Sequence, residues 1–219
     1  MRIDQLRNLG ILLFALGFVM VGCSPFGAGT QRQTQYYVLS SLQSEEVSIQ
    51  PLADLSGIGI GVGPIRMPLY LDRSDIVTRG SSNQVEIADF AQWAGPLPEN
   101  FSRVLAENLS VLLSTDKVGI FPFVRRDMVD FYVTVYVTRF DGMPGDRAYL
   151  RARWSILDNR RAKSFYEKHT VTSHPTIDGS TEALIAAKSS TVSELSREIA
   201  EALWEVSQSN PPKKRRANL

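Results

Sequence analysis

Cysteine and histidine are almost absent from this sequence. The 219-residue chain contains one cysteine, Cys23, and two histidines, His169 and His174. One cysteine cannot close an intramolecular disulfide, so packing alone must hold the fold together. Because Cys23 lies far along the chain from both histidines, the sequence also argues against a structural zinc site, and we expect no metal centre.

A catalytic site is equally hard to assemble from these residues. A histidine-dependent hydrolase needs a nucleophile and an orienting acid beside the base. Ser173 and Asp178 lie close to His169 and His174 in the sequence, but such closeness is weak evidence for a catalytic group. We therefore expect surface histidines and a protein that is not an enzyme.

An excess of charge of one sign is also lacking. The chain has 24 basic and 23 acidic residues, a formal net charge of +1, so no global field points to nucleic acid as a partner. It is 43% hydrophobic and 21% charged, which is typical of a folded chain. Its length suits one ordinary domain with attached segments.

The N-terminus lacks a hydrophobic run long enough to span a membrane. Residues 12–21 form an apolar run of about ten residues, whereas a spanning helix needs ~20. With Arg2 and Arg7 before it, this run is typical of a secretory signal peptide, which we place at residues 1–22. Cys23 follows at once, and the stretch resembles a bacterial lipobox. An ordinary signal with an incidental cysteine is the alternative.

Resemblance to a lipobox implies that Cys23 becomes the first residue of the mature protein and carries acyl chains and diacylglycerol. Several acyl chains together anchor a protein firmly. Ser24 stands where an aspartate tends to retain lipoproteins in the inner membrane, so the resemblance implies the periplasmic face of the outer membrane. We expect no other cofactor. Residues 23–35 are small and polar and predict a flexible, lipid-anchored tether.

Residues 36–208 predict a single α+β domain, followed by a basic disordered tail at residues 209–219. Polar–apolar alternation predicts strands, and apolar stripes of helical period predict two amphipathic helices. We expect a two-layer sandwich in which a mixed or antiparallel sheet carries both helices on one face. One strand is expected to begin at Tyr36, and two more to form a hairpin within residues 74–93. The other expected strands are 58–64, 129–140, 147–158 and 161–173. The expected helices are 96–114 and about 180–208.

The glycine-rich stretch IGIGVGPI invites comparison with a phosphate-binding loop. A dinucleotide site needs glycines that open a helix directly after a strand, but here Pro64 and Pro68 follow. The alternation predicts instead a strand with apolar residues on one face and Gly59, Gly61 and Gly63 on the other. Glycine there permits close approach of another backbone or a bulky side chain. We expect Pro64 to end regular pairing.

Basic side chains gather at two places. Arg147, Arg151 and Arg153 are predicted to share one strand face, where they either form a solvated surface, which we favour, or bind an anionic surface. The KKRR sequence at residues 213–216 is interpreted as part of a solubilising tail. Contact of that tail with anionic lipid headgroups or a partner is the alternative.

Three motifs follow the lipobox and an opening YYVL: IGVGPIRMPLYLDRSDIVTR, WAGPL and RVLAENLSVLL. In this order and spacing, over about residues 23–205, the chain resembles the ABC-type transport auxiliary lipoprotein family, to which the PqiC lipoproteins belong. Gly95 departs from the family pattern, since related chains often carry an acidic residue there. The resemblance implies a small α/β sandwich with no catalytic activity.

The resemblance also implies a function and partners. Such lipoproteins work with an MCE-domain protein that bridges the periplasm and with its inner-membrane ABC transporter. These systems move phospholipid or other hydrophobic molecules between the two membranes and support envelope integrity. The expected partners are therefore that assembly, outer-membrane phospholipid through the anchor, and further copies of the chain.

The segment from Pro64 to Arg79 has the chemistry of a docking surface. Its two prolines are expected to keep residues 64–70 extended, so little entropy is lost on binding. Tyrosine, arginine and tryptophan are enriched at binding hot spots. The alternative is that the segment only covers the edge of the core, with Asp72 capping a turn or pairing with Arg73. The predicted partner-binding residues are Pro64, Pro68, Tyr70, Asp72, Arg73, Arg79 and Trp93.

A second function stays open on the sequence alone: a periplasmic lipoprotein that itself binds a hydrophobic ligand or a cell-wall component. A lipid carrier needs a sizeable apolar cavity, whereas a docking subunit needs only a surface. Two helical stripes and one sheet face account for the apolar positions, so we favour the transport subunit.

Overall fold

The computed structural model describes residues 33–42, 49–81, 83–123, 125–160 and 162–212. From Thr34 onward the chain forms one compact unit, to which every element below belongs. The predicted signal peptide, the predicted acylation site Cys23 and the KKRR sequence lie outside the described residues.

The larger of two sheets has five strands, and the alternation in the sequence sets its two faces. In spatial order the strands are β5 (Val118–Ile120), β2 (Ile60–Arg66), β6 (Phe131–Gly142), β7 (Arg147–Asp158) and β8 (Ser164–Pro175). β2 runs parallel to both of its neighbours, and β6, β7 and β8 are each antiparallel to the next. The predicted run of three antiparallel strands is confirmed.

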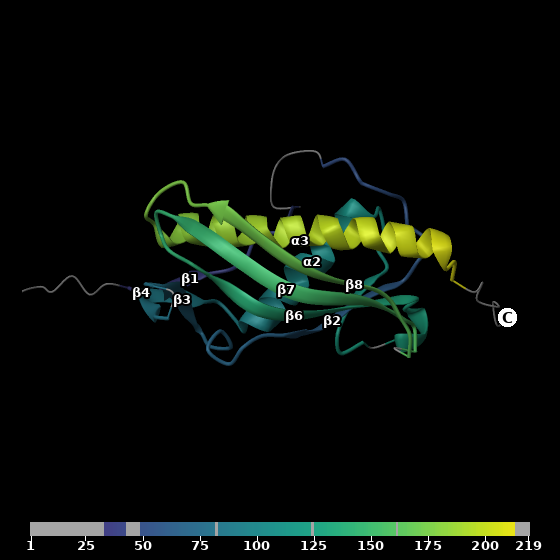
Figure 1. Cartoon of the computed structure of the whole chain (residues 1–219), viewed down its shortest axis with the longest axis horizontal. Helices are drawn as coiled ribbons and strands as arrows, with labels where there is room; N and C mark the ends of the chain where they lie inside the picture. The colour runs from purple at the N-terminus through teal and green to yellow at the C-terminus, as the bar shows by residue number, and fades with distance from the viewer. Residues whose placement is uncertain (1–32, 43–48, 82, 124, 161, 213–219) are drawn as a thin grey trace, which may run out of the picture. The chain divides into compact units, whose positions relative to one another are not determined.

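Two helices cover one face of this sheet (Figure 1). α2 (Leu97–Leu112) has Pro98 in its first turn. The amide groups of a first turn have no acceptor within the helix, so the amide that proline lacks is not required there. α3 (Thr181–Ser209) begins after Ser180, whose hydroxyl accepts a hydrogen bond from the Ala183 amide at 3.0 Å. α2 contacts β2 and β5, α3 contacts β6, β7 and β8, and the helices contact each other. The predicted α+β class, with both helices on one face, is confirmed.

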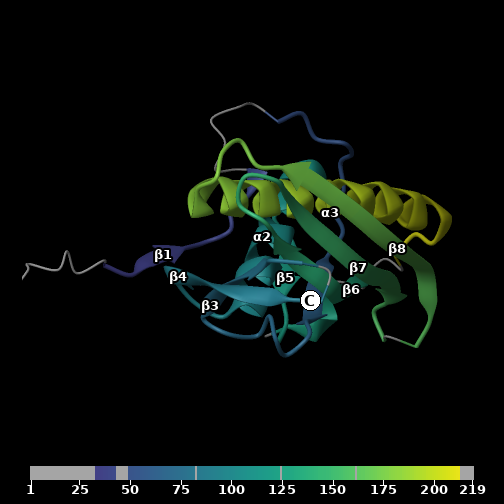
Figure 2. The same cartoon turned by 60° about the vertical axis from the view of Figure 1, so that its left-hand side comes forward.

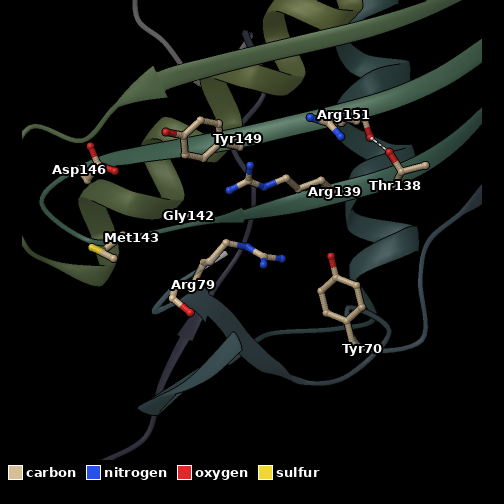
Figure 3. Close-up of a pocket in the computed structure, with 10 residues that line it drawn as sticks. Tyr70, Arg79, Thr138, Arg139, Gly142, Met143, Asp146, Tyr149 and Arg151 are labelled. Atoms are coloured by element: carbon tan, nitrogen blue, oxygen red, sulfur yellow. Dashed lines mark hydrogen bonds between the residues drawn. The ribbon is translucent and has the colours of Figure 1, made fainter. Parts of the chain in front are cut away.

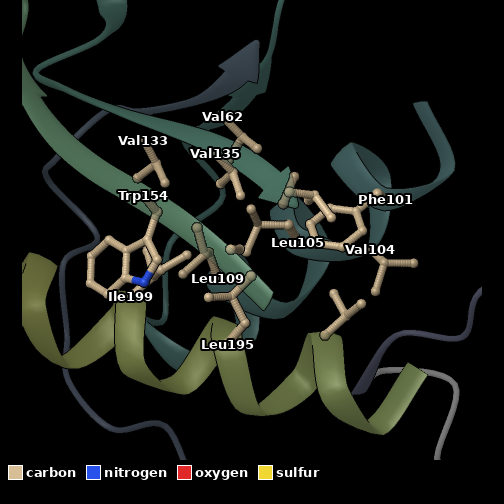
Figure 4. Close-up of a cluster of buried hydrophobic side chains, with 14 of the residues drawn as sticks. Val62, Phe101, Val104, Leu105, Leu109, Val133, Val135, Trp154, Leu195 and Ile199 are labelled. Atoms are coloured by element: carbon tan, nitrogen blue, oxygen red, sulfur yellow. The ribbon is translucent and has the colours of Figure 1, made fainter. Parts of the chain in front are cut away.

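The apolar core lies between the two helices and the inner face of the large sheet (Figure 4). Val135 of β6 and Trp154 of β7 lie with Leu109 of α2 and Ile199 of α3, and all four are at most 2% exposed. Burial of each such side chain stabilises the fold by ~1.5–3 kcal/mol. The Trp154 indole nitrogen stays satisfied because it donates to the Thr170 hydroxyl at 2.9 Å. None of the described helices is long and apolar enough to cross a membrane.

A second sheet has three strands, in the order β1 (Gln35–Tyr37), β4 (Val85–Trp93) and β3 (Asp75–Arg79). β3 and β4 form the predicted hairpin, with Val77 opposite Ile87, and β1 pairs with β4 in parallel. Figure 2 shows this sheet apart from β7 and β8. β3 also contacts β6, and this contact brings the small sheet against the large one.

Two prolines shape the passage from the large sheet to the small one. The expectation that Pro64 ends regular pairing is wrong: β2 continues beyond it, and the register with β6 shifts around Pro64, which accommodates its missing amide. At Pro68 the chain has left the sheet, and the Pro68 carbonyl accepts a hydrogen bond from the Leu71 amide at 2.9 Å. This turn separates β2 from β3, so the strands expected in one sheet divide into two.

The glycine face of β2 is closely covered, as its sequence predicts. A Cβ atom added to Gly59 would overlap the carbonyl oxygen of Met128, and one added to Gly61 would lie 2.8 Å from the Tyr132 ring. The next element along the chain is the strand β3, so no helix follows whose N-terminus could hold a phosphate. The glycines therefore serve close packing.

Candidate functional site

A bulge in β6 re-aims the last residues of that strand. Up to Val137, its apolar side chains face the helices and are buried. Between Val137 and Arg139 the register with β7 shifts, so Phe140 takes the inward position, with its ring centre 5.5 Å from that of Phe101. Arg139 and Asp141 consequently lie on the face of the sheet that points away from the helices. Re-aiming side chains in this way is a common effect of a β-bulge.

The re-aimed side chains border a cavity of about 510 Å³, here called the arginine cavity (Figure 3). Strands of both sheets and the loop between β2 and β3 contribute to its wall. Two residues predicted for partner binding, Tyr70 and Arg79, meet here. The full lining is Tyr70, Arg79, Ser81, Thr138, Arg139, Gly142, Met143, Asp146, Tyr149 and Arg151.

One buried carboxylate holds two of the arginines in place. Asp141 is fully buried, and its Oδ2 accepts hydrogen bonds from Nε and Nη2 of Arg79 at 2.9 and 2.6 Å. Its Oδ1 accepts one from Nε of Arg139 at 2.7 Å. The hydrogen bonds to Asp141 raise the pKa of Arg79. A buried carboxylate needs such partners to offset its lost hydration. Since Arg79 belongs to β3 and Asp141 to β6, their hydrogen bonds link the small sheet to the large one.

A second buried charge, Lys188 of α3, lies near this carboxylate. Its Nζ donates to the backbone carbonyl of Val77 at 3.3 Å and lies 5.2 and 5.5 Å from the ring centres of Phe140 and Trp93. Burial lowers the pKa of Lys188 to about 8, although the charge of Asp141 opposes this shift. Lys188 occupies an inward position of an amphipathic helix, and sequence reasoning did not single it out.

Two tyrosines complete the arginine cavity. The guanidinium carbon of Arg139 lies 4.1 Å from the ring centre of Tyr149, close enough for a cation–π contact. The Tyr70 hydroxyl lies on the same side of the cavity as the Arg79 guanidinium. Burial, followed by the charge of Asp141, raises the pKa of Tyr70, which therefore stays a neutral phenol near pH 7. Figure 3 shows the Tyr70 hydroxyl pointing toward the arginines.

The other predicted contact residues lie outside the arginine cavity. Arg73 pairs with Asp75 at 2.6 Å rather than with its neighbour Asp72, which is exposed. Pro68 is half-buried. Trp93 is only 3% exposed and serves as one wall around the Lys188 ammonium, so its indole contributes little to the surface.

Pro64 lines a second hollow of about 680 Å³, here called the apolar groove. The groove lies where β2 and β5 meet the start of α2. Gly95 borders it, and no heavy atom lies within 4 Å of a Cβ added there. The groove is lined by Val38, Gly63, Pro64, Ile65, Ala94, Gly95, Pro96, Pro98, Glu99, Asn100, Ser102, Arg103, Ile120 and Phe121.

His174 and Ser173 each have a side-chain partner, whereas His169 has an exposed position. Nε2 of His174 lies 2.9 Å from a carboxylate oxygen of Glu194 on α3, and His169 is exposed on β8. The Ser173 hydroxyl accepts a hydrogen bond from Arg147 at 3.3 Å. Among the described residues, no cluster of three or more His, Cys, Asp or Glu side chains could hold a metal ion.

The comparisons with known proteins identify the family. A model for the ABC-type transport auxiliary lipoprotein component matches residues 37–200. The chain belongs to this family. The family predicted from the sequence motifs is thereby confirmed. Members of this family are lipoproteins that assist transport. Membership therefore indicates a place in the bacterial cell envelope and association with a transporter. The match indicates no enzymatic family. No protein with curated annotation matches the chain.

Solved structures show the same auxiliary-lipoprotein fold. A Xanthomonas campestris protein of the DUF330 family has a TM-score of 0.65 and 14% identity, and the match covers 80% of this chain and 98% of that one. A second structure, of an uncharacterized protein, has a TM-score of 0.63 and 19% identity, and covers 78% and 99% of the two chains. At these identities the likeness supports the fold.

Proposed function

We propose that this lipoprotein is a non-catalytic outer-membrane subunit of an ABC/MCE-type system that moves phospholipid or other hydrophobic molecules between the two membranes. The observation that carries the proposal is the family match over residues 37–200. In this proposal residues 1–22 are removed as a signal peptide and Cys23 carries the acyl anchor. The folded domain then docks onto an MCE-domain protein that bridges the periplasm.

The docking surface we propose is the exposed part of the segment between β2 and β3. Leu69 is 88% exposed, although apolar side chains normally gain ~1.5–3 kcal/mol from burial. The turn between Pro68 and Leu71 fixes the backbone on which Leu69 stands, so little ordering is required on binding. The exposed Asp72 and Arg73 follow it in the chain with charge of both signs, which suits a polar rim near an apolar anchor.

A capture experiment with matched variants tests this surface. Leu69→Ser removes the exposed leucine, while Ile177→Ser removes an equally exposed isoleucine, 90% exposed, from the loop between β8 and α3. We expect wild type and Ile177→Ser to recover the MCE-domain protein from detergent-solubilised envelopes, and Leu69→Ser to recover several-fold less. Equal recovery by all three would disprove docking through Leu69.

The lipid anchor is tested on the same material. Mass spectrometry of the purified mature protein should find Cys23 as the first residue, carrying diacylglycerol and an acyl chain. The Cys23→Ala variant should lose both the modification and the membrane fraction. An unmodified N-terminus in the wild type would remove the anchor and with it the outer-membrane placement.

The apolar groove favours one alternative function, a lipoprotein that itself binds a hydrophobic ligand. Its volume of about 680 Å³ lies in the range of ligand sites, and its lining is mainly apolar. Lipid extraction and mass spectrometry of the purified protein separate the two functions. A stoichiometric lipid lost in a Val38→Arg variant, without recovery of an MCE-domain protein, would favour the ligand-binding function.

A further inference from the structure

We propose that the arginine cavity is a binding site for a phosphate group, borne by a lipid headgroup or by a soluble phosphoester. The site goes beyond the proposed transport role and does not depend on it, because the cavity belongs to the folded domain itself. The observations are the convergence of three guanidinium groups in one cavity, the donors that Arg139 and Arg151 leave unused, and the buried carboxylate that orients Arg79 and Arg139.

The three guanidinium groups come from three strands, of which β3 lies far from β6 and β7 in the sequence. Arg79 ends β3, Arg139 follows the bulge in β6, and Arg151 lies opposite Arg139 on β7. Like charges repel, so such a cluster is stable only with counter-charge. Asp141 supplies one negative charge for Arg79 and Arg139 together. One positive charge of that pair, and the whole charge of Arg151, therefore remain for a ligand.

Hydrogen-bond donors remain as well. Arg139 gives only Nε to Asp141, and its two terminal nitrogens have no hydrogen-bond partner among the described residues. The side chain of Arg151 likewise has no hydrogen bond or ion pair within that part of the chain; its backbone carbonyl accepts from the Thr138 hydroxyl at 3.2 Å. Terminal guanidinium nitrogens present paired donors that match two oxygens of a phosphate.

The surroundings favour phosphate over a carboxylate. Guanidinium groups on three strands, together with the Tyr70 hydroxyl, approach the cavity from several directions, as Figure 3 shows. A tetrahedral phosphate offers acceptors in as many directions, whereas a carboxylate offers two oxygens in one plane. The one carboxylate in the lining, Asp146, lies at the end of the cavity away from Tyr70 and Arg151 (Figure 3).

The cavity is organised before any ligand arrives. The bulge fixes where Arg139 leaves β6, the Tyr149 ring supports its guanidinium at 4.1 Å, and Asp141 holds its Nε at 2.7 Å. A preorganised donor loses little entropy on binding. At about 510 Å³ the cavity admits a phosphate with its glycerol or alcohol substituent but is too small for two long acyl chains as well. A lipid would therefore bind by its headgroup alone.

Isothermal titration calorimetry on the full chain in neutral detergent tests the site at pH 7 and low salt. The probes are inorganic phosphate, sn-glycerol 3-phosphate, dihexanoyl phosphatidylglycerol below its micelle-forming concentration, and acetate. We expect saturable binding of the phosphate probes with Kd below roughly 1 mM and at least tenfold weaker binding of acetate. The phospholipid binding at least tenfold more tightly than the other two identifies a headgroup as the source; equal affinities identify soluble phosphoesters.

Matched arginine variants locate the binding. Arg151→Gln should weaken phosphate binding by about tenfold, because a charge-assisted pair of hydrogen bonds is lost. Arg153→Gln, two residues along the same strand and outside the cavity lining, should leave the affinity unchanged. Arg151→Lys should give an intermediate loss, since it keeps the charge without the planar fork. Circular dichroism confirms that each variant is folded.

Three results would overturn the proposal. They are no saturable binding of any phosphate probe, equal losses for Arg151→Gln and Arg153→Gln, or acetate binding as tightly as phosphate. None of these results bears on the capture of an MCE-domain protein, which depends on Leu69, so the two proposals fail independently.

Discussion

Replacing the buried lysine of α3 should stabilise this protein, and the gain should depend on pH. Lys188 is 1% exposed, and its ammonium has one backbone hydrogen bond, to Val77, and two aromatic rings around it. Methionine has nearly the same length and no charge. Lys188→Met should therefore remove the desolvation cost while keeping the packing between α3 and the two sheets.

The magnitude follows from the pKa of the lysine. Burial lowers the pKa of Lys188 from 10.5 to about 8, and roughly 2.5 units correspond to about 3 kcal/mol. Below pH 8 the lysine is protonated in both states, so the folded state carries the full cost. Between about pH 8 and 10.5 the unfolded state binds more protons than the folded state, and the stability of the wild type rises with pH.

Urea unfolding followed by tryptophan fluorescence measures this difference. Lys188→Met should exceed the wild type by about 3 kcal/mol at pH 7 and by less than about 1 kcal/mol at pH 10. Lys117→Met, at an exposed lysine, controls for the loss of one charge and should show neither effect. A Lys188→Met variant that is less stable than the wild type at pH 7, or a difference independent of pH, would refute the reasoning.

Three further stability changes follow from the packing. Gly59→Ala should cost at least 1–3 kcal/mol, because the added methyl overlaps a backbone carbonyl; Gly57→Ala, with nothing within 4 Å, should be neutral or slightly stabilising, and equal effects of the two in urea unfolding would contradict the close approach. Asp141→Asn should cost ~3–5 kcal/mol, because the buried Lys188 and the half-buried Arg79 and Arg139 lose their counter-charge; a loss under 1 kcal/mol would show the cluster to be solvated. Ser180→Ala should lower the free energy of unfolding by ~1 kcal/mol through loss of the helix cap. An unchanged melting temperature would argue that the cap is dispensable.

Local patterns sufficed to predict most of the fold. Apolar residues alternate with polar ones from Ala148 to Ile156 in β7 and from Phe131 to Val137 in β6. Such a pattern is expected where one face of a sheet is buried. The helices carry stripes of helical period, and Pro98 and Ser180 mark their beginnings. Each of these signals is contained within one element, so the sequence displays it directly.

The arginine cavity could be predicted only in part, because it depends on contacts between distant elements. Tyr70 and Arg79 were identified as binding residues by type, but their partner Asp141 lies 62 residues beyond Arg79. In the sequence VYVTRFDG the apolar alternation already breaks at Arg139, where the bulge lies, but this local break does not reveal which distant residues the re-aimed side chains meet. Trp93 was predicted by type alone to be a contact residue, and composition could not reveal that it lies against a buried lysine.

A costly buried lysine invites the question of what it contributes, and the arginine cavity offers an answer. The Lys188 ammonium partly offsets the charge of Asp141, which leaves Arg79 and Arg139 more positive toward the cavity. Phosphate affinity should then fall several-fold between pH 7 and pH 9, as Lys188 loses its proton.

A phosphodiester such as dihexanoyl phosphatidylglycerol keeps one charge over this range, and Tyr70, whose pKa is raised, stays neutral. Lys188→Met should bind the phosphodiester as weakly at pH 7 as the wild type does at pH 9. An affinity that Lys188→Met leaves unchanged at pH 7 would show that the lysine serves the packing of the two sheets and not the cavity.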